Sequence, residues 1–295
     1  MAHGATHDVR EYYEVNTEAF RKLGHGRATG AIRRAVWAPG VQSRSEAFRY
    51  VDERIAGELR ATVERLGLAA PPRVLDFGCG LGASLIALAE HSPIDGLGIT
   101  LSPLQAQLAS ERILASGLRS QLQCVEGDFL HAAVGGGHAQ LVLSIEAFVH
   151  SPTPGAFFDA AAAQLAPGGS LVVCDDFECE PGARARTPRE QRWLREFRHG
   201  WVAASVVPFS EANAAAERAG LVLQTSEVWN PYLELSRPRD RLLALFLALA
   251  RPLRPGGHRF RSWLGGHALQ RGLSTGLIEY RYCVWRKPGP EPRAR

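Results

Sequence analysis

Short apolar runs alternate with amphipathic segments from residue 73 towards the end of the chain. The runs are typical of buried strands, and the segments between them have the apolar spacing of helices. This alternation predicts βαβ units, and therefore an α/β fold in which helices cover both faces of a mostly parallel sheet. The expected strands are 73–78, 95–99, 122–127, 141–145, 170–176, 221–228 and 277–285. The expected helices between them are 83–91, 102–118, 154–165 and 211–220.

Three segments fall outside the alternation. In the first, apolar residues from Phe48 to Leu66 recur every three or four positions, which predicts a helix over 45–67 that packs on the sheet. The other two follow the fifth and sixth expected strands, where ligands of open α/β sheets bind, so we expect them to form a helical cap. The expected division is an N-terminal cap and packing helix (1–70), a core (71–228) with a cap insertion (177–209), a second cap insertion (229–276), the last strand (277–287) and a disordered tail (288–295).

Composition narrows the function without naming it. The chain has 295 residues, 45% of them hydrophobic, and a formal net charge of 34 − 30 = +4 without a lysine-rich tract, so we expect no nucleic-acid partner. Five dispersed cysteines without a CxxC pair predict reduced thiols, no zinc site and a cytoplasmic protein. The longest apolar run, 242–250, is shorter than the roughly 20 residues that span a bilayer, so no transmembrane segment is expected. The sequence leaves open whether the chain forms a homo-oligomer.

The stretch VLDFGCGLG at 74–82 carries the first candidate chemistry. It places Gly78, Gly80 and Gly82 between a strand and a helix, where glycine permits a tight turn and the close approach of a ligand. Asp76 would repel a pyrophosphate but suits a cationic amine, which points to S-adenosylmethionine (SAM). The alternative is a turn that serves packing alone.

These residues resemble the class I SAM-dependent methyltransferases over 45–228 and 277–286. The resemblance implies a seven-stranded Rossmann-like sheet with its last strand antiparallel, and a cofactor held at Asp76, Gly78 and Gly80. The stretch GITLSPLQ at 98–105 is similar to the branch of sterol C-methyltransferases, cyclopropane fatty acid synthases and prenyl diphosphate C-methyltransferases.

That branch implies further cofactor contacts. The backbone of Thr100 and Leu101 and the side chain of Gln105 would hold the ribose, while Ser102 is also expected to cap the following helix. Asp128 would accept a hydrogen bond from the adenine amino group with Phe129 beside the ring, or would cap a turn. Ile145, at the end of the fourth strand, completes the implied cofactor set.

Glu146 and His150 follow Ile145, so they are expected at the carboxyl edge of the sheet. A buried carboxylate needs a partner or a cationic ligand. If a methyl group reaches an alkene, Glu146 would stabilise the carbocation and His150 would remove a proton. SIEAFVHSP is similar to this stretch of sterol C-methyltransferases, and also of small-molecule O-methyltransferases in which the histidine deprotonates a hydroxyl. Alternatively, Glu146 pairs with an arginine and His150 caps a helix.

Asp175 and Asp176 end the fifth expected strand. One of them could orient His150 or hold a metal ion, with Asp176 as the catalytic candidate, and one would cap a turn. Two adjacent acids do not define a metal site, so we expect none in the protein and leave Mg²⁺ open only as an ion carried by a diphosphate substrate.

The segments outside the core carry the candidate substrate contacts. EYYEVNTEAF at 11–20 resembles the opening helix of the same branch, in which a tyrosine closes over the cofactor; Tyr13 is preferred to Tyr12, and a helix facing the core is the alternative. Arg33, Arg34 and Trp37 are candidate substrate-binding residues. Seven arginines in 237–261 flank the apolar run and suit an anionic apolar substrate, although a solvated face or an interfacial helix also fits.

The function expected from these features is C-methylation of an isoprenoid alkene, with a prenyl diphosphate as one form of this small apolar substrate. Two alternatives remain. One is O- or N-methylation of a natural product with His150 as base, and the other is SAM binding without turnover.

Overall fold

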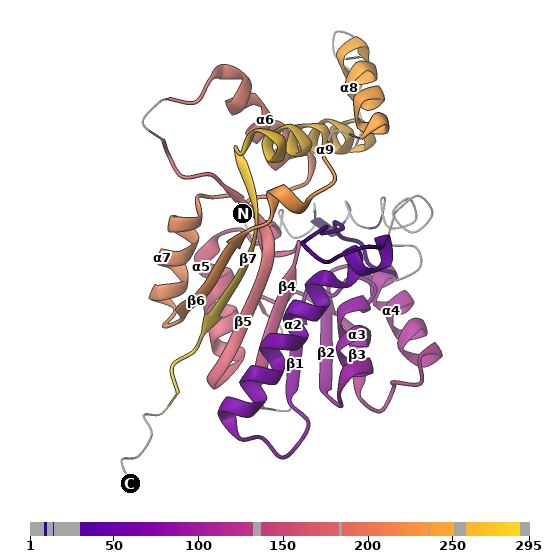
Figure 1. The fold of residues 1–295 in the computed structure, drawn as a ribbon, viewed down its shortest axis with the longest axis vertical. Coiled ribbons are helices and arrows are strands. Elements are labelled where there is room, and N and C mark those ends of the chain that lie inside the picture. Colours follow the sequence, from indigo (N-terminus) through magenta and orange to yellow (C-terminus); the bar gives the residue numbers. More distant parts are fainter. Residues whose placement is uncertain are drawn as a thin grey trace.

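A single seven-stranded sheet forms the centre of the computed structural model, which describes residues 9, 10, 14, 30–131, 137–182, 185–235, 237–250 and 258–289 (Figure 1). The strand order is β3-β2-β1-β4-β5-β7-β6, and β7 runs antiparallel to both of its neighbours. The strands are β1 (Arg73–Phe77), β2 (Asp95–Thr100), β3 (Leu122–Glu126), β4 (Ala139–Ile145), β5 (Leu165–Glu178), β6 (Val222–Val228) and β7 (Ile278–Arg286). The expected Rossmann-like sheet with an antiparallel last strand is confirmed.

Helices cover both faces of the sheet. One face carries α2 (Arg44–Leu66), α3 (Ala83–His91) and α4 (Pro103–Ala115), and the other carries α5 (Pro154–Gln164) and α7 (Phe209–Arg218) (Figure 1). Each lies within two residues of its expected bounds, except that α4 ends three residues early. β5 starts earlier than expected, at Leu165, and includes the Pro-Gly-Gly segment at 167–169.

The core lies on both sides of the sheet and explains why these runs fold as they do. The central strands β1, β4 and β5 are buried almost throughout. On α2 the periodic residues Phe48, Val51, Ile55 and Leu59 are buried, as expected, and the helix is closed by Ser43 at its N-cap and Gly67 at its C-cap.

Three helices lie beyond the carboxyl ends of the strands and form the cap: α6 (Pro188–Gly200), α8 (Pro238–Ala250) and α9 (His258–Thr275) (Figure 1). Thr187 and Glu190 form a capping box that fixes the start of α6. α6 and α9 approach closely at Gly200. A Cβ on this residue would lie 2.4 Å from the carbonyl oxygen of Arg261. The short helix η2 (Asn230–Tyr232) leads from β6 to α8.

The five cysteines are buried or half-buried. All five thiols are unpaired, and Cys79, Cys174 and Cys283 are buried. Among the helices that the structure describes, none has the length and apolar character needed to cross a bilayer.

Candidate functional site

The glycine turn after β1 forms the floor of a small hollow of about 50 Å³, the glycine cleft. Gly78, Gly80 and Gly82 all have positive φ angles, of 88°, 53° and 71°. The N–H groups of Gly78 and Cys79 donate to the carbonyl of Ile99 at 2.9 and 3.0 Å, which joins the turn to the end of β2. The cleft is lined by Gly30, Ala31, Ile32, Arg33, Asp76, Gly78, Cys79, Gly80, Leu81, Ala83, Ser84 and Ile145.

Asp76 gives the glycine cleft its electrostatic character. Burial raises the pKa of Asp76 to about 8, although Arg33 opposes the shift. An ionised carboxylate in this position is therefore costly without a cationic neighbour. The cleft fits a ligand with an ammonium group better than one with a phosphate.

The expected ribose contacts lie at the end of β2. Thr100 donates from Oγ1 to Oε1 of Gln105 at 2.8 Å, and both side chains are buried. Leu101 lies between them and Ser102, which caps α4 by accepting from the N–H of Gln105 as expected. These residues are next to the glycine turn in space through β1 and β2, but they do not line the glycine cleft.

The two candidates after β3 differ in their surroundings. Asp128 accepts a hydrogen bond from the N–H of Leu130 at 3.0 Å, so it caps a turn. Phe129 stacks on Phe77 with ring centroids 5.1 Å apart and meets Phe157 edge-on in the core. The structure thus gives both residues structural partners.

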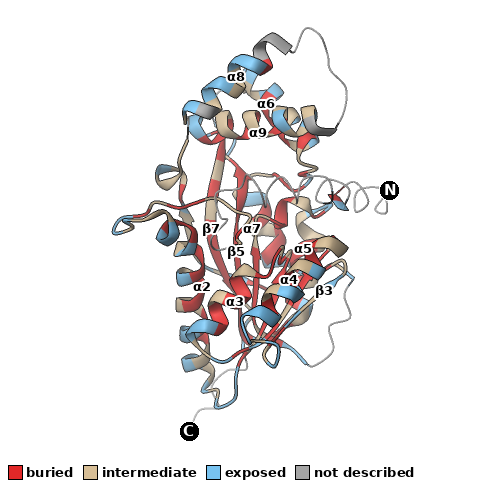
Figure 2. Cartoon of the chain, turned by 90° about the vertical axis from the view of Figure 1, so that its right-hand side faces the viewer, coloured by how far each residue is buried: buried red, intermediate tan, exposed pale blue. Residues whose placement is uncertain are grey.

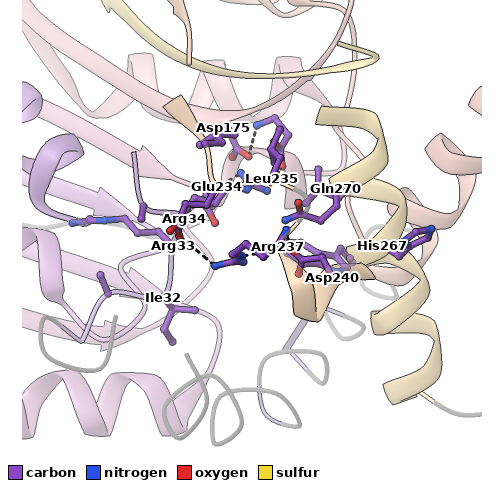
Figure 3. Close-up of a pocket in the computed structure, with 18 of the residues that line it drawn as sticks. Ile32, Arg33, Arg34, Asp175, Glu234, Leu235, Arg237, Asp240, His267 and Gln270 are labelled. Carbon is purple, nitrogen blue, oxygen red and sulfur yellow. Dashed lines mark hydrogen bonds and ion pairs between the residues drawn. The ribbon is translucent and has the colours of Figure 1, made fainter. Parts of the chain in front are cut away.

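A larger hollow of about 330 Å³, the capped cavity, lies beside the glycine cleft. Ala31, Ile32 and Arg33 line both hollows, and Ile145 lines the cleft while Glu146 lines the cavity. The chain therefore passes from one hollow to the other at the end of β4. The cap supplies the opposite wall, where Arg237, Asp240 and Gln270 face the segment that carries Arg34 (Figure 3).

Glu146 is held by the sheet and by the segment before α2. Its φ of 53° is unusual for a residue other than glycine and marks local strain. Its Oε1 accepts from the N–H of Arg34 at 2.9 Å and from the hydroxyl of Tyr280 at 3.0 Å. The guanidinium of Arg34 lies 3.5 Å from the same oxygen. No hydrogen bond from the described residues reaches Oε2, so that oxygen can meet a ligand.

Asp176 lies with Glu146 around Arg34. Arg34 donates to Oδ2 of Asp176 at 2.7 Å and stacks over the ring of Tyr280. Burial lowers the pKa of Arg34, but the nearby carboxylates outweigh it and hold that pKa above its usual value. Burial raises the pKa of Asp176 to about 6, and burial together with the Asp176 charge raises the pKa of Asp175 well above its usual range.

His150 ends the short helix η1 (Phe148–His150) and lines the capped cavity. Its Nδ1 lies 3.2 Å from the carbonyl of Val202, which places the proton of the neutral ring on Nδ1 and the lone pair on Nε2. Burial lowers the pKa of His150 to about 4, so the ring is neutral at pH 7. The N-cap of α5 is Thr153 and not His150.

The remaining candidates separate into different environments. Arg33 donates to the carbonyl of Phe48, to Ser84 and to Asp52, so its guanidinium anchors the segment to α2 and α3. Trp37 does not line either hollow. Tyr12 and Tyr13 lie outside the described residues.

Every arginine that lines the capped cavity has a carboxylate partner in the protein. Beyond Arg33 with Asp52 and Arg34 with Asp176, Arg44 pairs with Glu234 at 3.2 Å, and Arg237 lies 3.3 Å from both Glu234 and Asp240. Within the described part of the chain, no group of three or more acidic, histidine or cysteine side chains is arranged to hold a metal ion.

Tyr280 is the functional candidate that the sequence did not reveal. It lies within the apolar run of β7, where an aromatic residue is expected in the core. Only the antiparallel pairing of β7 with β5, which sets Tyr280 opposite Asp176, brings its hydroxyl to Glu146.

The chain is similar to known proteins in sequence and in fold. Residues 50–226, more than half of the chain, match the family described as a methyltransferase domain. A probable chloroplastic tocopherol O-methyltransferase of Oryza sativa subsp. japonica is 27% identical over 260 residues, which cover 84% of this chain and 72% of the relative. A 24-methylenesterol C-methyltransferase 2 of the same organism is 28% identical over 270 residues, 85% of this chain and 72% of the relative.

Solved structures share the fold. The crystal structure of geranyl diphosphate C-methyltransferase from Streptomyces coelicolor A3(2), in complex with Mg²⁺, geranyl diphosphate and S-adenosyl-L-homocysteine, aligns with a TM-score of 0.64 at 14% identity. The alignment covers 96% of this chain and 98% of that one.

Proposed function

This chain belongs to the methyltransferase domain family as a class I SAM-dependent methyltransferase, and we propose that it methylates an alkene carbon of a neutral isoprenoid. The observation that carries the proposal is the carboxylate of Glu146 at the boundary between the glycine cleft and the capped cavity. A fixed carboxylate is of most use where positive charge develops during the reaction. Methylation of an alkene creates such a charge on the acceptor.

The residues of the glycine cleft fit SAM, which when bound supplies an electrophilic methyl group. Asp76 would bind its ammonium group, and the turn at Gly78 and Gly80 leaves room for the cofactor beside the backbone. Ile145 would lie next to the transferred methyl group, and Glu146 on the acceptor side of it.

The protein's part in the reaction is to orient the acceptor and to handle charge and proton. The alkene π electrons would form the new bond to the methyl carbon as its bond to sulfur breaks and the sulfur keeps that electron pair, so that a cation would develop on the neighbouring carbon of the acceptor. Oε2 of Glu146 would stabilise that cation, while Arg34 and Tyr280 hold the carboxylate in place through Oε1. Nε2 of the neutral His150 would take the proton whose loss restores the double bond. The nearby charge of Glu146 favours the resulting imidazolium.

The charges of the capped cavity support a neutral acceptor over a diphosphate. A diphosphate would need to compete for arginines that already have carboxylate partners, among them Arg237 and Arg44. The apolar part of the lining includes Phe48, Trp201, Leu235 and Leu269. The cavity, about 330 Å³, is within the size range of small-molecule sites and suits a short prenyl chain.

The test compares acceptors with methyl-labelled SAM. Geraniol, a ten-carbon prenyl alcohol, is expected to receive label on carbon, with kcat/KM about tenfold or more above that for geranyl diphosphate with Mg²⁺, equivalent to ~1.4 kcal/mol. If carbon is labelled only when geranyl diphosphate is the acceptor, the proposal of a neutral acceptor is wrong, whereas the proposal of C-methylation stands. Label only on oxygen would overturn C-methylation.

A second candidate function, O-methylation, is favoured by the tautomer of His150. With Nδ1–H directed at Val202, Nε2 can accept the proton of a hydroxyl as directly as that of a carbocation. Phenolic acceptors in the same assay, with label on oxygen, would identify this reaction.

Cofactor binding is expected to depend on pH through Asp76. The ligand-free carboxyl has a pKa of about 8 and is mostly protonated at pH 6.5, and a cationic ligand favours its ionised form. Affinity for S-adenosylhomocysteine should therefore rise from pH 6 towards pH 8, with release of about one proton per ligand at the lower pH. Calorimetry in two buffers of different ionisation enthalpy measures this release.

The control for this titration is the Asp76→Asn variant. It should bind more weakly and lose the proton release, because no carboxyl remains to titrate. A wild-type affinity that is flat from pH 6 to pH 8, without proton release, would show that Asp76 does not meet the ammonium group.

A further inference from the structure

We propose that the outer surface of the cap docks on an anionic lipid surface, and that the acceptor enters the capped cavity from there. Docking stands independently of the reaction, whereas the delivery of an acceptor rests on the proposed function. Both are carried by α8 and the first half of α9.

The outer face of α8 is apolar and exposed to solvent. Leu242, Leu245 and Phe246 are 69%, 60% and 49% exposed and lie at the i, i+3 and i+4 positions of one helix face. Trp263 of α9, 46% exposed, meets Phe246 edge-on with ring centroids 5.9 Å apart. We call these four residues the outer patch, and Figure 2 shows the exposed stretch of α8 that carries it. Clustered exposed apolar side chains of this size mark an interaction surface.

Two exposed arginines lie on the helices that carry the outer patch. Arg241 and Arg261 are both exposed, and within the described chain neither forms an ion pair. The arginines that line the capped cavity are, in contrast, all paired with carboxylates. An apolar helix face with exposed arginines on the same two helices, and with a tryptophan at its edge, is complementary to anionic headgroups over acyl chains.

The same charges disfavour a second copy of the chain as the occupant. A symmetric contact through the outer patch would bring the Arg241 and Arg261 side chains of two copies together, which is electrostatically unfavourable. An anionic lipid surface can contact the apolar residues with its acyl chains and the arginines with its headgroups.

The inner side of the same helices explains what docking would achieve. Leu243, next to Leu242 in the chain, lines the capped cavity, and His267 and Gln270 of α9 do so too. One thickness of helix therefore separates the outer patch from the site. An apolar acceptor that is poorly soluble in water could move from lipid to cavity along this short path.

The experiment is vesicle flotation with the full chain, without SAM or acceptor, so that its result does not depend on activity. Vesicles of equal parts phosphatidylglycerol and phosphatidylcholine are compared with phosphatidylcholine alone. The wild type is expected to bind the anionic vesicles at least about tenfold more tightly, because each arginine near an anionic surface contributes about fivefold to binding. Leu242→Gln with Leu245→Gln should reduce binding about tenfold or more.

A matched control is available on α4. Leu114 is as exposed as Leu245, at 60%, but lies away from the cap, so Leu114→Gln should bind vesicles as the wild type does. Arg241→Gln with Arg261→Gln should remove the preference for anionic vesicles. Circular dichroism melting curves of all variants check that each is folded.

Three results would overturn the docking proposal. They are absence of vesicle binding, equal losses in the Leu114 control and the double leucine variant, and a concentration-dependent dimer that the leucine variant alone abolishes. Vesicle binding with the expected variant pattern, together with no transfer of label to any alkene, would keep the docking and reject the proposed reaction instead.

Discussion

Replacing Glu146 with glutamine should lower kcat about 10²- to 10³-fold, the range observed when a single fixed electrostatic group is removed from an active site. Glutamine retains the size of the side chain and an oxygen for the N–H of Arg34 and the hydroxyl of Tyr280. What it loses is the negative charge next to the developing cation. Affinity for S-adenosylhomocysteine should stay nearly unchanged, because Glu146 does not line the glycine cleft.

The measurement separates rate from binding, with methyl transfer for kcat and calorimetry for the cofactor product. Glu234→Gln is the matched control, since Glu234 also lines the capped cavity but pairs with arginines on the cap side. It should change kcat far less than Glu146→Gln. An unchanged rate in Glu146→Gln would assign Glu146 a structural role, as the partner of Arg34 alone.

The Gly78→Ala variant should lose about 3 kcal/mol of unfolding free energy, and its affinity for the cofactor with it. The positive φ of 88° costs an alanine about 1–2 kcal/mol. In addition, the new methyl group would lie 2.3 Å from Cβ of Ala147, and relieving such overpacking costs about 1–3 kcal/mol more. Ala147 follows Glu146 directly, so the displacement would move the proposed catalytic carboxylate as well.

Gly80→Ala is the control for backbone strain. Gly80 also has a positive φ, of 53°, but no atom lies within 4 Å of the Cβ that an alanine would add. Its loss in chemical denaturation should be about 1 kcal/mol, from the backbone alone. Equal losses in the two variants would mean that the contact with Ala147 is not what makes glycine necessary at position 78.

The predictions for Glu146 and Gly78 concern the same contact between two turns of the fold. The turn after β1 and the turn after β4 touch at Gly78 and Ala147, and each opens onto a different hollow. The packing at this contact therefore affects the glycine cleft and the position of Glu146 together.

Local signals in the sequence are sufficient for the elements and for the glycine turn. Strand and helix periodicities, the Ser102 cap and the three glycines depend on neighbours a few residues away, and the structure has them where the pattern predicts. The same local logic identified Glu146 and His150 as residues at the carboxyl edge of the sheet.

The contacts that give those residues their chemistry could not be read in this way. The bond from the N–H of Arg34 to Glu146 joins residues 112 positions apart, and that from Tyr280 to Glu146 joins residues 134 apart. Both depend on the strand order, on the register between β5 and β7 and on the path of the segment before α2. The arginines of the cap illustrate the same limit, because their count suggested an anionic substrate. Among those whose surroundings the structure describes, Arg237 pairs with carboxylates at the cavity, whereas Arg241 and Arg261 are exposed. Periodicity in a chain specifies which face of an element is apolar, whereas the pairing of charges is set only when distant elements pack together.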